Sequence, residues 1–161
     1  MSKKIPETLS SDSIEVRDSA IHGRGVYSLK KIKKNECIVE YLGQRISWKE
    51  AIKRHPHDPL QPFHTFYFSL SNAKVIDGNV NGNVAKWINH SCKPNCETKE
   101  IKDKNNKLRV FIFAKKSINK DEELFYDYGL ELDAEHTKEE QLNYQCHCGQ
   151  KNCRRTMLAK K

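Results

Sequence analysis

Short runs of apolar and β-branched residues alternate with turns along most of this chain. Most of the runs are four to seven residues long, and Gly, Asn and Asp separate them, a pattern that is typical of strands. The pattern predicts eight strands, over residues 14–17, 26–29, 37–42, 65–70, 74–76, 96–101, 108–114 and 123–126.

Two segments have the pattern of a helix. The sequence that begins Ser47-Trp-Lys-Glu fits a capping box and predicts a helix from Ser47 to about Arg54. Residues 84–88 predict a single short helical turn. Prolines at positions 56, 59 and 62 interrupt the chain before the next strand. The expected fold is therefore mainly β, in the α+β class.

Length and composition narrow the class of protein. A chain of 161 residues is long enough for one domain with a real core. No run approaches 18 consecutive apolar residues, which argues against a membrane span, and the first residues lack the apolar segment of a secretory signal. We therefore expect an intracellular protein of the cytoplasm or the nucleus.

The charge is large and unevenly distributed. The chain carries 29 Lys and Arg against 21 Asp and Glu, a net charge of +8. Nine of the acidic residues lie within positions 121–140, where Lys138 is the only basic residue. The remaining basic body suits nucleic acid or an acidic partner, although Lys-rich loops are about as often simply solvated.

Six cysteines stand at positions 37, 92, 96, 146, 148 and 153. Without a signal peptide, a clustered set of this kind fits a metal site better than disulfides. The last three form the pattern C-x-C-x4-C, and three thiolates so close in sequence suit tetrahedral zinc. A structural zinc site takes four ligands, so the fourth would be Cys92, Cys96, Cys37 or a His. The alternative is three free or oxidised thiols.

Three further motifs contain candidate functional residues. The sequence HGRGVY at residues 22–27 has two glycines that allow close backbone approach to a ligand, but it is no dinucleotide fingerprint, since it lacks the third Gly and the following helix. Asn89 and His90 lie between a predicted helical turn and a strand, next to a candidate zinc ligand. Tyr126 and Tyr128 are two residues apart and would face the same side of a strand, where they either line a pocket or pack in a core.

Taken together and in order, these motifs resemble the SET-domain protein lysine methyltransferases. The resemblance covers about residues 14–158 and rests on HGRGVY, VEYLGQRI, GNVAKWINHSCKPNC, EELFYDYG and the C-x-C-x4-C tail. It implies a SET fold of several small sheets with a C-terminal pseudoknot and a short post-SET tail stapled by zinc. The expected organisation is a flexible tail over 1–12, a catalytic domain over 13–130, an acidic linker over 131–143 and a post-SET segment over 144–161.

The resemblance also assigns roles to individual residues. The residues matched to S-adenosylmethionine binding are His22, Gly23, Arg24, Gly25, Phe66, Asn89 and His90, with Tyr144 and His147 as candidates for packing on the adenine. Tyr128 matches the tyrosine at the methyl-transfer site, Tyr41 matches a second pocket tyrosine, and Tyr126 stands where the degree of methylation is controlled. The implied zinc ligands are Cys92, Cys146, Cys148 and Cys153.

The implied function is that of an S-adenosylmethionine-dependent protein-lysine N-methyltransferase with one structural zinc ion. Its expected substrate is a histone tail or another Lys-rich basic protein, with contact to DNA or the nucleosome as a further expectation. A tyrosine at position 126 predicts mono- or dimethylation. The alternative is a catalytically inactive, zinc-containing module that binds chromatin or nucleic acid.

Overall fold

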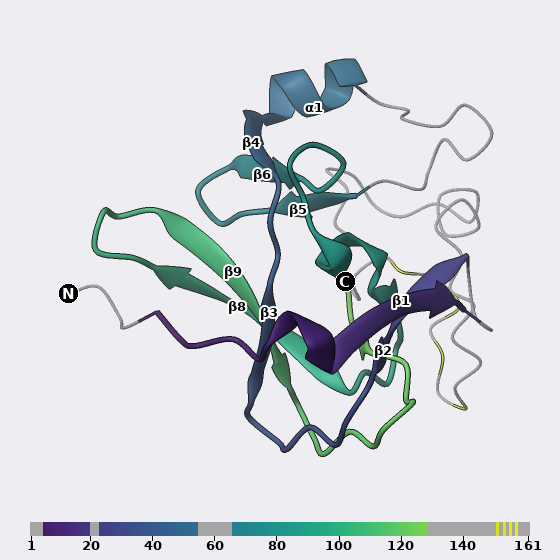
Figure 1. Ribbon diagram of the computed structural model, residues 1–161. Helices are drawn as coiled ribbons and strands as arrows, with labels where there is room; N and C mark the ends of the chain where they lie inside the picture. The colour runs from purple at the N-terminus through teal and green to yellow at the C-terminus, as the bar shows by residue number, and fades with distance from the viewer. Residues whose placement is uncertain are drawn as a thin grey trace. The chain divides into compact units, whose positions relative to one another are not determined.

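The computed structural model describes residues 5–19, 23–54 and 66–128, and positions 151, 153, 155 and 157. These residues form a strand-rich structure with few helices (Figure 1). The chain divides into two compact units. The first unit comprises Met1–Ser10, Glu36–Lys86 and Thr98–Phe113, and the second comprises Ser11–Asn35, Trp87–Glu97 and Ala114–Lys161.

The first unit contains an antiparallel sheet of three strands in the order β4-β6-β5. These strands are β4 (Gln44–Ser47), β5 (Tyr67–Ser69) and β6 (Lys74–Asp77), and helix α1 (Trp48–Arg54) follows β4 directly. Ile46, Ala51 and Val75 form a small buried cluster between the helix and the sheet. The helix therefore buries one face against β4 and β6.

A second three-stranded sheet has the order β3-β9-β8. Its strands are β3 (Cys37–Glu40), β8 (Cys96–Lys102) and β9 (Leu108–Ala114), and β3 runs antiparallel to β9 with an irregularity between Cys37 and Val39. Val110, Phe111 and Ile112 on β9 are at most 1% exposed. The middle of this central strand is therefore buried on both faces, which explains the unbroken apolar run from Val110 to Ala114.

The second unit is built from two pairs of short strands. Strands β1 (Ile14–Asp18) and β2 (Arg24–Ser28) are antiparallel, whereas β7 (Asn89–His90) and β10 (Phe125–Tyr126) are parallel. A 3-10 helix, η1 (Ser11–Ser13), leads into β1, and another, η2 (Val84–Trp87), precedes β7. The N–H of Leu124 donates to the carbonyl of Val26 at 2.7 Å, which attaches the entry of β10 to β2.

The expected elements are largely confirmed. Each of the eight predicted strands overlaps an observed one, and Ser47 caps the predicted helix by accepting a 3.1 Å hydrogen bond from the N–H of Glu50. The sequence did not predict β4, β7 or η1. No helix in the described part of the chain is long and apolar enough to cross a membrane. The acidic linker and most of the post-SET segment lie outside the described residues, and the domain boundaries remain predictions.

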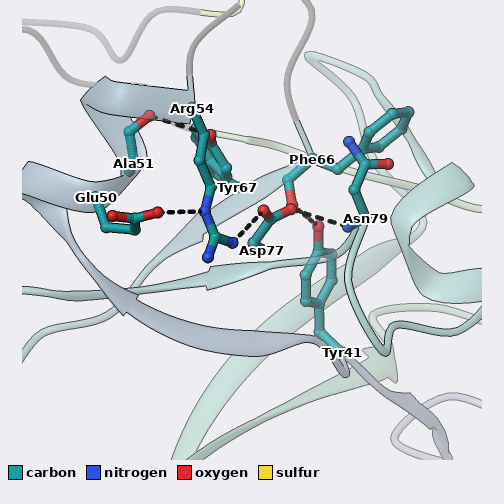
Figure 2. A network of polar contacts seen from close by, with 8 residues as sticks. All are labelled: Tyr41, Glu50, Ala51, Arg54, Phe66, Tyr67, Asp77 and Asn79. Atoms are coloured by element: carbon teal, nitrogen blue, oxygen red, sulfur yellow. Dashed lines mark hydrogen bonds and ion pairs between the residues drawn. The ribbon is translucent and has the colours of Figure 1, made fainter. Parts of the chain in front are cut away.

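A buried carboxylate fixes the C-terminal end of α1 to the sheet (Figure 2). Asp77 has no exposed side-chain surface and accepts a 3.0 Å bond from the guanidinium of Arg54. Arg54 also pairs with Glu50 at 2.9 Å. The hydrogen bond to Glu50, followed in size of effect by the one to Asp77, raises the pKa of the Arg54 guanidinium. Tyr67 donates to the carbonyl of Ala51 at 3.1 Å. Side chains from α1, β5 and β6 thus hold the helix at a defined angle to the sheet.

Candidate active site

In the second unit, the start of strand β2 is joined to strand β7 by one side chain. The Nδ2 of Asn89 donates to the carbonyl of Arg24 at 2.9 Å and to Oε2 of Glu123 at 3.0 Å. A Cβ atom on Gly25 would lie 2.4 Å from that same carboxylate oxygen, so any larger residue here would displace the Glu123 side chain. Gly23 has a φ of 51°, a left-handed conformation that glycine adopts readily. The predicted residues Gly23, Arg24, Gly25 and Asn89 therefore lie together.

Glu123 lies at the centre of this arrangement, although no role was expected for it from the sequence. Its carboxylate accepts hydrogen bonds from Ser19 Oγ at 2.8 Å, Tyr27 OH at 3.0 Å and Asn89 Nδ2 at 3.0 Å. An ionised carboxylate only accepts hydrogen bonds, so it suits three converging donors. Glu123 thus connects β7, β2 and the residue that follows β1.

His90 is linked to Tyr128 through the backbone. The N–H of Tyr128 donates to Nδ1 of His90 at 3.0 Å, which assigns the ring proton to Nε2. The hydroxyl of Tyr128 forms a short hydrogen bond to the carbonyl of Ile88. The ring centroids of His90 and Tyr128 are 5.3 Å apart in an edge-on arrangement. His90 therefore holds the backbone of Tyr128, and Ile88 holds its hydroxyl.

The side chains of Tyr126 and Tyr128 lie close together. Their ring centroids lie 4.9 Å apart, although β10 ends at Tyr126. Tyr126 is 7% exposed, and burial raises the pKa of its phenol well above the ordinary value. The phenol of Tyr126 is consequently protonated throughout the physiological range and can act as a hydrogen-bond donor.

Two of the four expected zinc ligands lie within the described residues, and they are close together. Cys92 Sγ is 3.8 Å from Cys153 Sγ, too far for a disulfide. Tetrahedral zinc with Zn–S bonds of about 2.3 Å places its sulfur ligands roughly 3.8 Å apart. The geometry of this pair therefore fits two thiolates on one zinc ion.

The described residues do not by themselves contain three possible ligands grouped as a metal site. Cys146 and Cys148 lie outside the described residues. Among the other candidates for the fourth ligand, Cys37 and Cys96 are 7% and 1% exposed, and burial raises the pKa of their thiols to about 11 and about 12. The 3.8 Å distance to Cys153 makes Cys92 the best-placed body-side cysteine.

Tyr41 and Phe66 meet in the first unit. The hydroxyl of Tyr41 donates to the carbonyl of Phe66 at 2.8 Å (Figure 2), and the N–H of Gly78 donates to the same oxygen at 2.8 Å. Tyr41 is 3% exposed and packs on Phe68 with a centroid distance of 5.3 Å. The Nζ of Lys86 lies 5.3 Å from the centre of the Phe66 ring. The other predicted cofactor residues, His22, Tyr144 and His147, lie outside the described residues.

Comparison with solved structures defines the class of this fold. A structure described as "ctPRC2 in an autoinhibited conformation bound to S-adenosylmethionine" matches with a TM-score of 0.67 and 27% identity, over 73% of this chain and 15% of that one. A humanized mutant of the Chaetomium thermophilum Polycomb Repressive Complex 2 bound to the inhibitor GSK126 matches with a TM-score of 0.63 and 29% identity, over 72% and 15% of the two chains. The expected β-rich fold of several small sheets is confirmed.

The family model for the SET domain matches residues 23–129. The chain therefore belongs to the SET-domain family. It is 35% identical over 146 residues to "Histone-lysine N-methyltransferase trr" of Drosophila melanogaster and, at the same identity and length, to "Histone-lysine N-methyltransferase 2B" of Homo sapiens. These matches cover 91% of this chain but 6% and 5% of the relatives. With "Histone-lysine N-methyltransferase ASHH1" of Arabidopsis thaliana the identity is 43% over 110 residues, 68% of this chain and 22% of that protein.

Proposed function

We propose that this protein is a protein-lysine N-methyltransferase that uses S-adenosylmethionine and acts on histone tails or a similar Lys-rich protein. The observation that carries the proposal is the hydrogen-bonded group of Arg24, Asn89 and Glu123, together with the hydrogen bond of Tyr128 to Ile88, the residue before Asn89. The names of the relatives and the S-adenosylmethionine bound to one structural neighbour support the same activity. Histone substrates would place the protein with chromatin in the nucleus.

S-adenosylmethionine would supply a methyl group on a sulfonium sulfur, which makes the transfer an in-line displacement. The target lysine amine has an ordinary pKa of about 10.4 and must lose its proton before it can attack. A narrow aromatic site lowers that pKa by desolvation and aligns the amine, so much of the rate comes from positioning. In this proposal Tyr126 and Tyr128 form the described part of that aromatic site. No nucleophilic side chain is required.

The roles of individual residues follow the same proposal. Asn89 would hold the cofactor-contacting turn through the carbonyl of Arg24, and the fixed oxygen of Tyr128 would face the transferred methyl group in a weak C–H···O contact. Tyr41 would be a second tyrosine of the lysine channel. Phe66, His90, His22, Tyr144 and His147 would complete the cofactor site.

The first test is methyl transfer with radiolabelled S-adenosylmethionine over a panel of histones, nucleosomes and cell lysates. Labelled protein, together with cofactor binding by calorimetry, is the expected result. Cofactor binding separates the two classes of function, because an inactive chromatin or nucleic-acid module would not bind S-adenosylmethionine. Absence of both binding and label would overturn the proposed activity.

A structural zinc ion is part of the proposal, held by Cys92 and Cys153 with Cys146 and Cys148. We expect about one zinc per chain by elemental analysis, and Cys153→Ser should lower this content and weaken cofactor binding several-fold, because loss of a ligand loosens the metal site. Limited proteolysis should then cut the variant faster in its C-terminal segment. Cys37→Ala, which removes a buried thiol outside the proposed site, is the control and should keep its zinc. A metal-free wild type with free thiols would contradict the zinc site.

Tyr126 is proposed to limit methylation to the mono- or dimethyl product. Its protonated hydroxyl occupies space and can hold a water molecule beside the amine, so Tyr126→Phe should increase the proportion of higher methylation states, as measured by mass spectrometry. Tyr67→Phe removes a comparable hydroxyl in the first unit and should leave the product distribution unchanged. Abundant trimethyl product from the wild type would disprove this role.

A further inference from the structure

Two lysine-rich segments that are far apart in sequence are held side by side in the second unit. Ile32 and Ile118 exchange reciprocal backbone hydrogen bonds of 2.8 Å, and the N–H of Asn35 donates to the carbonyl of Ala114 at 2.8 Å. Both isoleucines are fully buried. The two segments run together along the lower edge of Figure 1. The fold therefore fixes the backbone from which the neighbouring lysines extend.

Seven exposed lysines flank the two buried isoleucines. This lysine surface consists of Lys30, Lys31, Lys33, Lys34, Lys115, Lys116 and Lys120. Neither 29–35 nor 115–120 contains an acidic residue. Four acids directly follow these segments, against seven lysines: Glu36, Asp121, Glu122 and Glu123. Asp121 pairs with Arg17 at 3.0 Å, Glu122 accepts from Asn119 at 3.1 Å, and Glu123 accepts from the donors described above. Positive charge is therefore concentrated here, and a polyanion is the partner that such a surface attracts.

The type of side chain indicates which polyanion fits. Both segments lack arginine, the residue that contacts bases or carboxylates in a bidentate manner. They also lack aromatic residues, on which single-stranded bases stack. Among the described residues the exposed large hydrophobic side chains are Leu42, Trp48 and Val84. None of them lies in these two segments, so the segments have no exposed large apolar side chain that could insert into a membrane. Lysines alone make sequence-independent contacts to phosphates.

We propose that the lysine surface binds the phosphate backbone of duplex DNA without regard to sequence. Duplex DNA carries one negative charge per about 1.7 Å of its axis, so a group of neighbouring lysines can contact several phosphates at once and release their counterions. This binding needs neither cofactor nor methyl transfer. Its failure would therefore leave the proposed enzymatic activity intact, and its success would not establish that activity.

The test is fluorescence anisotropy of a labelled duplex titrated with the full chain at several salt concentrations. The variant K31Q/K34Q/K116Q should bind about tenfold more weakly near 0.1 M salt. The slope of log K against log salt should become shallower by about 2 to 3, close to 0.9 for each lost phosphate contact. The matched control K102Q/K104Q/K107Q removes three exposed lysines near the β8–β9 turn of the first unit and should change the affinity and slope much less.

Three results would overturn the proposal. The first is an equal loss of DNA affinity in the control variant, which would mean a bulk charge effect. The second is tighter binding of a polyglutamate peptide than of DNA, which would mean an acidic protein partner. The third is no binding of DNA at 50 mM salt. A second measurement needs no variant: acylation of the wild type with an amine-reactive ester, with and without the duplex, read by mass spectrometry. DNA should protect the lysine surface more than Lys102, Lys104 and Lys107, and uniform protection would contradict the assignment.

Discussion

Tyr128→Phe is expected to lower the rate of methyl transfer by about a hundredfold or more while leaving the affinity for S-adenosylmethionine nearly unchanged. The hydroxyl of Tyr128 is fixed by its bond to the carbonyl of Ile88, and His90 accepts from the backbone N–H of the same residue. Phenylalanine keeps the ring but removes both that bond and the oxygen proposed to face the methyl group. Loss of positioning of this kind lowers kcat by about two orders of magnitude.

Single-turnover kinetics and cofactor titration together measure this effect. Tyr67→Phe is the matched control, because it removes a phenol that donates to the carbonyl of Ala51 in the first unit. The control should retain the wild-type rate, and both variants should show similar thermal unfolding. A Tyr128→Phe enzyme with an unchanged rate would remove this residue from the proposed chemistry. Weaker cofactor binding with unchanged kcat would instead make Tyr128 a cofactor-binding residue.

The elements that could be predicted from sequence are those with a local signal. Strand β9 contains an apolar run from Val110 to Ala114, the helix α1 begins with a capping box at Ser47, and Tyr126 and Tyr128 are spaced for one side of a strand. Each of these features depends on residues within one segment, where periodicity and capping act. Their positions in the structure agree with the sequence pattern for that reason.

The features that could not be predicted depend on tertiary pairing. Strand β7 is two residues long, too short for any periodicity, and exists because it pairs with β10. Strand β4 has Ile46 as its only apolar residue, so its alternation gives no clear signal. Glu123 stands at the start of a predicted strand, where a charged residue is unremarkable. Its three donors come from residues 19, 27 and 89, which only the folded chain brings together.

The proposed zinc site combines a signal that is local in sequence with one that depends on tertiary structure. The spacing of the C-terminal cysteines indicated a metal, but left the body-side ligand open between a histidine and three cysteines, at positions 37, 92 and 96. Burial and distance discriminate among these three, because only Cys92 is both partly exposed and 3.8 Å from Cys153. Neither burial nor that distance can be obtained from spacing along the chain.

Glu123→Gln should raise the KM for S-adenosylmethionine about tenfold with a smaller change in kcat. The carboxylate accepts from three donors, whereas a glutamine amide offers one oxygen and adds an NH2 group that would face the donating amide of Asn89. The loss of a hydrogen bond to a charged group is worth about 1.5 to 3 kcal/mol, which matches a tenfold effect or more. One of these donors, Asn89, also holds the carbonyl of Arg24 at the start of β2. Glu123 is therefore a positioning residue for the cofactor.

Glu122→Gln is the matched control, because it changes the neighbouring carboxylate, whose partner is the side chain of Asn119. It should leave the KM unchanged. Gly25→Ala should act in the same direction as Glu123→Gln, since its new Cβ would collide with the Glu123 carboxylate at 2.4 Å. A general loss of stability would lower the melting temperature and the active fraction, and hence apparent kcat, without raising KM. That pattern, or an equal effect of Glu122→Gln, would show that Glu123 supports the fold and not the cofactor turn.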